Sequence, residues 1–157
     1  HKEYRRQRQM CIRDSRNGTR IKTIKLDDLE LPKCSLVKVD VEAHEWEVIK
    51  GGKNFLKKHK PVLYMEAKND VPGTKKYLKW LLDNDWRCYW HFAFWFRKNN
   101  YKNDNNDMKP GVGDMNILAV PSQKNQPNDL LELSSWDEDW NEENLQKFYQ
   151  SKNIPMV

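Results

Sequence analysis

The chain has 157 residues, of which 38% are hydrophobic and 32% are charged. That length suffices for one ordinary domain with its own core, and the high charged fraction predicts a very polar surface. No run approaches the roughly 18 consecutive apolar residues of a membrane-spanning helix, and the first residues carry Arg and Lys without the apolar block of a signal peptide. We therefore expect a cytoplasmic protein that does not insert into a membrane.

The net charge of +5 is unevenly distributed, because the first part of the chain is rich in Lys and Arg and the tail is acidic. Such a charge can attract nucleic acid or an anionic surface weakly, but it is more often only a solvated face. The three cysteines, Cys11, Cys34 and Cys88, show neither the paired spacing of a zinc site nor a disulfide framework. We expect them to be reduced thiols.

Residues 1–19 form a basic arm that we expect either to be disordered or not to belong to the protein. The segment Arg8–Ser15 resembles the peptide that results from translating a common sequencing adapter. We assign no function to this arm.

The first half of the chain predicts two strands, each followed by helical structure. Residues 21–24 alternate as a short strand would, and residues 26–31 predict a helical turn closed by a proline. Residues 36–41 are a β-branched run without Gly or Pro, which is typical of a strand buried on both faces of a parallel sheet. From His44 the pattern becomes helical, and we expect Gly51-Gly52 to interrupt that helix.

The second half continues the alternation of strands and helices. A second buried strand is predicted over residues 62–66, and the following helix begins at Pro72 and ends near Asn84-Asp85. Its apolar stripe is Tyr77, Leu78, Leu81 and Leu82. A third strand over residues 86–92 leads into a polar, Asn-rich loop, and a last strand over residues 115–120 stops at a proline.

This order of elements predicts an α/β sheet with right-handed crossovers and flanking helices. Four strands make only half of such a fold, so we expect a partial domain over residues 20–121. Residues 122–157 form an acidic tail with one short helix near residues 142–149. Trp136 and Trp140, at helical spacing, would pack that tail onto the body.

Polar side chains follow the predicted strands where each one ends. Ligands of open α/β sheets collect at the carboxyl ends of the strands, and carboxylates are costly to gather there unless they meet a cation, a base or a hydrogen-bonded ligand. His44 has the pKa that suits a general base acting on a hydroxyl. The candidates are Asp40, Glu42 and His44 after the first strand, Glu66 and Lys68 after the second, His91 at the end of the third, and Asn116 at the start of the last.

Structural roles explain some of these residues equally well. Glu45 and Glu47 can simply favour the first turn of a helix through its dipole, and His44 can be a surface residue next to that turn. Lys38 lies in an otherwise apolar strand and needs a partner, which Asp40 or Glu66 could supply. Asp40 is the strongest catalytic candidate. The Asp-x-Glu-x-His spacing fits a divalent cation no better than many surface loops do, so we assign no metal site.

Several motifs in order resemble the FkbM family of S-adenosylmethionine-dependent methyltransferases. They are Asp27–Leu29, Leu36–Glu42 with Glu45, Glu47–Gly51, Pro61–Glu66, Tyr89–His91, Phe96–Tyr101 and Asn116–Pro121. The resemblance implies the C-terminal portion of a Rossmann-like class I methyltransferase sheet, S-adenosylmethionine as donor, and O-methylation of a hydroxyl on a sugar, lipid or other small molecule. It places Asp40 and Glu42 at the family's acidic strand end, and Glu66 at the acidic end of the next strand.

Two departures from the family pattern limit what we expect of this chain. Ala43 stands where the family usually has glycine. No Gly-x-Gly lies on a plausible strand-to-helix turn, so the loop that would bind the donor is absent and the donor-binding residues are unknown. We therefore expect a fragment that is inactive alone and carries the acceptor half of the enzyme.

Two other functions compete with methyl transfer. The aromatic and basic residues between Arg87 and Lys98 fit a non-catalytic module that stacks nucleic-acid bases, although alternation in a strand would bury half of those rings. We do not expect nucleic acid as the partner. A different Rossmann-type enzyme, such as a nicotinamide dehydrogenase, is excluded only by the resemblance.

Overall fold

The computed structural model describes residues 22–96, 100–104, 106, 109 and 111–152, so the expected basic arm lies outside the described residues. In chain order the elements are η1 (Leu26–Asp28), β1 (Leu36–Val39), α2 (Glu45–Lys50), α3 (Lys53–His59), β2 (Val62–Glu66), α4 (Pro72–Leu82), β3 (Trp86–Phe94), β4 (Gly113–Pro121), β5 (Leu131–Glu132) and α5 (Glu142–Ser151). The expected strand over residues 21–24 is not found, since residues 22–24 belong to no element.

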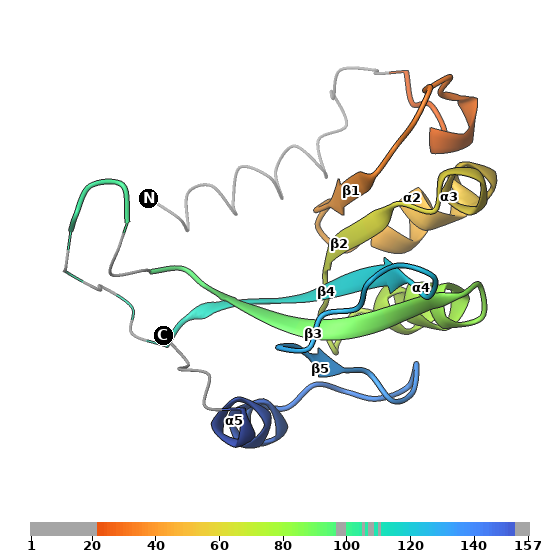
Figure 1. The fold of residues 1–157 in the computed structure, drawn as a ribbon. Coiled ribbons are helices and arrows are strands. Elements are labelled where there is room, and N and C mark those ends of the chain that lie inside the picture. Colours follow the sequence, from red (N-terminus) through yellow and green to blue (C-terminus); the bar gives the residue numbers. More distant parts are fainter. Residues whose placement is uncertain (1–21, 97–99, 105, 107–108, 110, 153–157) are drawn as a thin grey trace.

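The five strands form one mixed sheet in the order β1-β2-β4-β3-β5 (Figure 1). β1 and β2 are parallel, whereas β4 is antiparallel to both of its neighbours, β2 and β3. β1, β2 and β3 therefore run in the same direction, and β4 returns between β2 and β3. The expected α/β class is confirmed, and the carboxyl ends of β1, β2 and β3 lie at the same edge of the sheet.

Glycine and proline set the helix boundaries as their chemistry requires. Helical structure breaks between α2 and α3 at Gly51 and Gly52, as expected. A Cβ at Gly52 would lie 2.7 Å from a methyl carbon of Leu26, so only glycine lets η1 pack this closely. α4 begins at Pro72, whose missing N–H would have no helical partner there.

One face of the sheet carries the hydrophobic core. α2, α3, α4 and α5 contribute apolar side chains to a single buried cluster with the strand residues that point to that face. Tyr77, Leu78 and Leu81 of the predicted α4 stripe are buried there. The largest fully buried side chains of this core include Trp86, Trp90, Tyr77, Leu63, Met65 and Ile117.

The opposite face of the sheet buries Tyr89 and Val120 but carries polar side chains nearer the carboxyl ends of β2 and β3. Alternation along β2, β4 and β3 places Tyr64, Glu66, Asn116 and His91 on it, and no described helix covers it. The expectation that residues 36–41 form a strand buried on both faces is therefore wrong. β1 is an edge strand in the described sheet, and Leu36 is 61% exposed.

The tail packs onto the body at one of its two tryptophans. Trp140 is partly buried against the core, and its backbone oxygen accepts a hydrogen bond from Asn69. Trp136 stays 39% exposed, with the ammonium of Lys79 5.7 Å from its ring centroid. α5 spans Glu142–Ser151, slightly longer than predicted.

The burial of Cys88 can be checked by thiol labelling. Burial raises the pKa of Cys88 to about 12, and the thiolate is the reactive form. At about pH 8.5, where an unfolded thiol is half ionised, we expect iodoacetamide to modify the partly exposed Cys34 and to spare Cys88. Peptide mapping by mass spectrometry measures both sites. In guanidinium, where the protein is unfolded, both cysteines should react equally. Labelling of Cys88 in the folded protein would contradict its place in the core.

Candidate functional site

The turn between β1 and α2 has an unusual backbone. Glu42 and Ala43 have φ values of 50° and 72°, in the left-handed region that costs a residue with a Cβ about 1–2 kcal/mol. Glu45, the first residue of α2, is only 3% exposed, and its Oε1 accepts hydrogen bonds from the backbone N–H of Val41 at 3.4 Å and of Ala43 at 3.2 Å. One buried carboxylate therefore ties the turn to the helix.

Asp40 directly follows β1 and is paired with Lys38. The Lys38 Nζ donates to Asp40 Oδ2 at 2.8 Å, and both side chains are more than half exposed. The hydrogen bond to Asp40, followed by its charge, raises the pKa of Lys38. Asp40 is one of the two partners expected for Lys38. The expected burial of Lys38 is wrong, because β1 lies at the edge of the described sheet.

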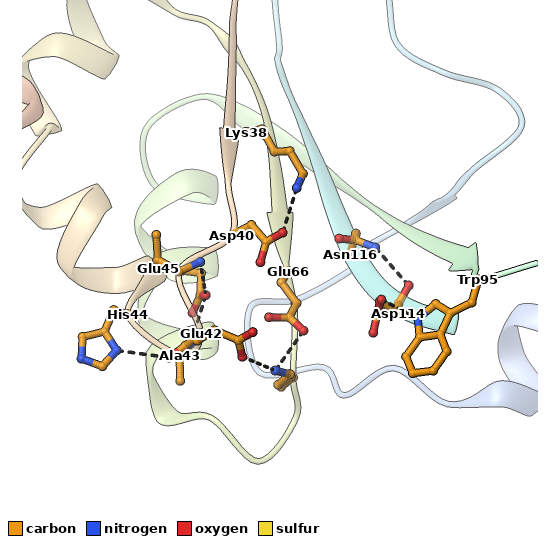
Figure 2. Close-up of polar contacts among 12 residues, drawn as sticks. Lys38, Asp40, Glu42, Ala43, His44, Glu45, Glu66, Trp95, Asp114 and Asn116 are labelled. Carbon is orange, nitrogen blue, oxygen red and sulfur yellow. Dashed lines mark hydrogen bonds and ion pairs between the residues drawn. The ribbon is translucent and has the colours of Figure 1, made fainter. Parts of the chain in front are cut away.

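Lys68 joins the ends of β1 and β2. Its Nζ lies 2.9 Å from Glu66 Oε1 and 3.7 Å from Glu42 Oε2. Partial burial lowers the pKa of Lys68, but its hydrogen bond to Glu66 and the attraction of the neighbouring carboxylates outweigh burial, so the net shift is upward. The ammonium therefore stays charged and holds together the carboxylates of Glu42 and Glu66, which Figure 2 shows side by side.

A row of polar side chains continues across the sheet from Glu66. Glu66 pairs in register with Asn116, and Asn116 pairs with His91. His91 Nδ1 lies 2.8 Å from the Tyr64 hydroxyl. His91 was expected at the end of a strand over residues 86–92, but β3 continues to Phe94; His91 reaches the row from the polar side of the sheet.

His44 lies apart from these groups. It precedes α2 as an exposed residue, and its Nδ1 is 3.2 Å from the backbone oxygen of Glu42. Figure 2 shows its ring pointing away from Glu66. The structure thus brings Glu42, Glu66 and Lys68 together, places Asp40 beside them and directs His44 elsewhere; the catalytic and binding roles of all these residues stay predictions.

Sequence reasoning missed three features of this edge. Glu45 was considered for the helix dipole and as part of the family motif but not as a cap, although a carboxylate placed a few residues after a strand end can also cap a turn. Tyr64 could have been found from alternation, which puts it on the same face as Glu66. Trp95 Nε1 donates to Asp114 Oδ2 at 2.6 Å, a contact between residues far apart in the chain that no local pattern indicates.

The described residues contain no group of three His, Cys, Asp or Glu side chains that could hold a metal ion. Nor is any helix in the described ranges long and apolar enough to cross a membrane.

Comparison with known protein families identifies a match. The family model described as the methyltransferase FkbM domain matches residues 9–89, just over half of the chain. This range contains Asp40, Glu42, Glu66 and Lys68 and ends within β3, before His91. No curated protein and no solved structure matches the chain.

Replacement of Ala43 by glycine tests the strain in the turn. Glycine removes the cost of the left-handed conformation, about 1–2 kcal/mol, but it makes the unfolded chain more flexible, at a cost of about 0.4–1 kcal/mol. We expect Ala43→Gly to stabilise the fold by about 0.5 kcal/mol, measured by urea unfolding. Ala93→Gly, in β3 where φ is not positive, is the control and should destabilise it. Destabilisation by both substitutions would contradict a left-handed Ala43.

Removal of the Glu45 carboxylate tests the tie between the turn and α2. Glu45→Ala leaves the N–H groups of Val41 and Ala43 without this acceptor, so we expect a loss of about 1–3 kcal/mol in the free energy of unfolding. Glu47 is the matched control in the same helical turn. Its carboxylate is exposed, and its Oε1 forms a surface ion pair with Lys50 Nζ at 3.4 Å. Glu47→Ala should change stability by less than about 0.5 kcal/mol. Equal effects of the two substitutions would refute the special role of Glu45.

Proposed function

This chain belongs to the FkbM methyltransferase family, and we propose that the protein transfers a methyl group from S-adenosylmethionine to a hydroxyl oxygen of a sugar, lipid or other small molecule. We further propose that the mixed sheet is the C-terminal portion of a Rossmann-like class I domain. The observation that carries the proposal is the acidic edge where β1 and β2 end. Ligands of α/β sheets bind at this edge, and here it holds Asp40, Glu42 and Glu66.

The described residues do not fit the donor. The loop that cradles such a cofactor is a glycine-rich turn from a strand into a helix. In the described ranges the glycines lie elsewhere: Gly51 and Gly52 between two helices, Gly73 within α4, and Gly111 and Gly113 at the approach to β4. We therefore place the donor on none of the residues that the structure describes and propose that its pocket lies in sequence outside them.

The acceptor side is where this chain's own residues act. Methylation of a hydroxyl oxygen releases its proton, which a nearby base must take. Asp40 is the best placed base, because its carboxylate is 53% exposed at the strand end and Lys38 holds it in position. Glu42 would orient the same hydroxyl. His44 would serve as base only if the turn brought its ring round to this side.

The row beyond the turn would bind the rest of the acceptor. Glu66, Asn116 and His91 present a carboxylate, an amide and an imidazole in register across three strands. Lys68 adds a charged donor beside them. Such a row can accept and donate several hydrogen bonds at once, which suits a molecule with several hydroxyls.

No observation favours the nucleic-acid alternative. Tyr89 and Trp90, two of the rings that would stack bases, are only 2% and 1% exposed. Alternation explains the burial of Trp90 in the core, whereas Tyr89 is buried on the opposite face of the sheet, so neither ring is exposed to stack a base.

Replacement of Asp40 tests this function in a protein extended upstream of the present chain. We expect Asp40→Asn to lower methyl transfer by about 100-fold or more, because the hydroxyl loses its base, and to leave S-adenosylmethionine binding unchanged by calorimetry. Formation of S-adenosylhomocysteine with a panel of sugars and lipids measures transfer.

Two controls accompany this experiment. Asp83→Asn removes an exposed carboxylate paired with Lys79 at the end of α4 and should leave transfer unchanged. The present chain should bind the donor poorly by itself. An extended protein that binds no S-adenosylmethionine would count heavily against the function, and full activity of Asp40→Asn would reject Asp40 as the base.

A further inference from the structure

Trp95 is a large aromatic ring held in a fixed position at the surface. It follows β3 directly and is 44% exposed. Its indole N–H donates to the Asp114 carboxylate at 2.6 Å, and its backbone N–H donates to the oxygen of Val112 at 3.0 Å. The ring is thus oriented by two contacts across the β3–β4 hairpin, although nearly half of its surface meets solvent.

The ring lies at the same edge of the sheet as the acidic turn. β3 runs in the direction of β1 and β2, so Trp95, Asp40 and Glu66 all stand at carboxyl ends. Asp114 enters β4 here, and its backbone oxygen accepts a hydrogen bond from Asn116, which pairs with Glu66. Figure 2 shows Trp95, Asp114 and Asn116 leading from the ring towards Glu66.

We propose that Trp95 and Asp114 form a subsite for a pyranose ring of the acceptor, so that the acceptor is a saccharide. One face of the sugar, with its C–H groups, would lie on the indole, because the electron-rich face of an aromatic ring attracts their partial positive charge. Hydroxyls at the rim of the sugar would donate to the Asp114 carboxylate, which can accept more than the one bond from Trp95. This inference rests on the proposed function and names its acceptor class.

The charges around the ring favour a neutral, hydroxylated ligand. Asp114 stands beside the ring and Asp40, Glu42 and Glu66 lie along the same edge, so a phosphate would be repelled. A lipid chain would leave the Asp114 carboxylate without a new partner. Lys109 places its ammonium 5.5 Å from the centroid of the Trp95 ring, where it partly offsets the acidic charge and can donate to a sugar oxygen.

Saturation-transfer NMR on the present chain tests the subsite with methyl glycosides of glucose, mannose and galactose as probes. We expect at least one glycoside to receive saturation on the protons of one ring face. Trp95→Ala should weaken its binding about tenfold or more, as loss of a stacking ring does elsewhere, and Trp95→Phe should retain most of it. Asp114→Asn should also weaken binding, because a neutral amide is a poorer acceptor than a carboxylate.

Trp136 provides the matched control. It is 39% exposed and has a lysine ammonium 5.7 Å from its ring centroid, but it lies in the tail segment before α5. Trp136→Ala should leave glycoside binding unchanged. Circular dichroism of each variant confirms that the fold is retained, and Trp95→Phe shows whether the ring or the local structure is needed.

The outcomes separate this inference from the function on which it rests. Absence of any glycoside signal, equal binding by Trp95→Ala, or Trp95-dependent binding of an oligothymidylate or of monomeric dihexanoylphosphatidylcholine instead would overturn the saccharide subsite. Methyl transfer by the extended protein to a non-saccharide acceptor would overturn it as well and leave the proposed function intact. Glycoside binding that needs Trp95, in a protein that transfers no methyl group, would support the subsite and reject the methyltransferase function.

Discussion

The buried carboxylate of Glu45 is the contact on which the acidic edge depends. The chain must leave β1 and enter α2 within a few residues, and it does so through two successive left-handed residues, Glu42 and Ala43. Such a backbone is costly for residues with a Cβ. The Glu45 side chain offsets that cost by accepting hydrogen bonds from two N–H groups of the turn. The conformation of the turn then directs Glu42 towards Lys68.

The mixed sheet extends this local arrangement into a wider site. Because β4 returns between β2 and β3, its first residues stand next to the last residues of both strands. A parallel neighbour would have placed its starting residues at the opposite edge. The antiparallel strand therefore adds Asp114 and Asn116 to an edge that would otherwise hold only strand ends, and it links the acidic turn to Trp95.

The two faces of the sheet differ in the side chains that they carry. All the described helices contribute to the core on one face, where Trp86, Trp90 and Tyr77 are fully buried. The other face keeps Tyr64 in contact with His91 and lines up the polar row. A polar face of this kind is stable only if its groups are paired or wet, and the contacts of Lys68 and Asn116 supply part of that pairing.

The sequence by itself determined the local elements and the composition of the acidic turn. The β-branched run before Asp40, the break at Gly51 and Gly52, and the start of α4 at Pro72 all follow from backbone preferences that act within a few residues. Only the tertiary structure decided that β1 is an edge strand with Lys38 exposed and that β3 continues beyond His91 to Phe94. It also decided the contacts of Tyr64 with His91, 27 residues apart, and of Trp95 with Asp114, 19 apart. The physical reason is that strand order and direction arise from pairings between segments that are distant in the sequence. The periodicity of one segment does not indicate which strand will pair with it in the sheet.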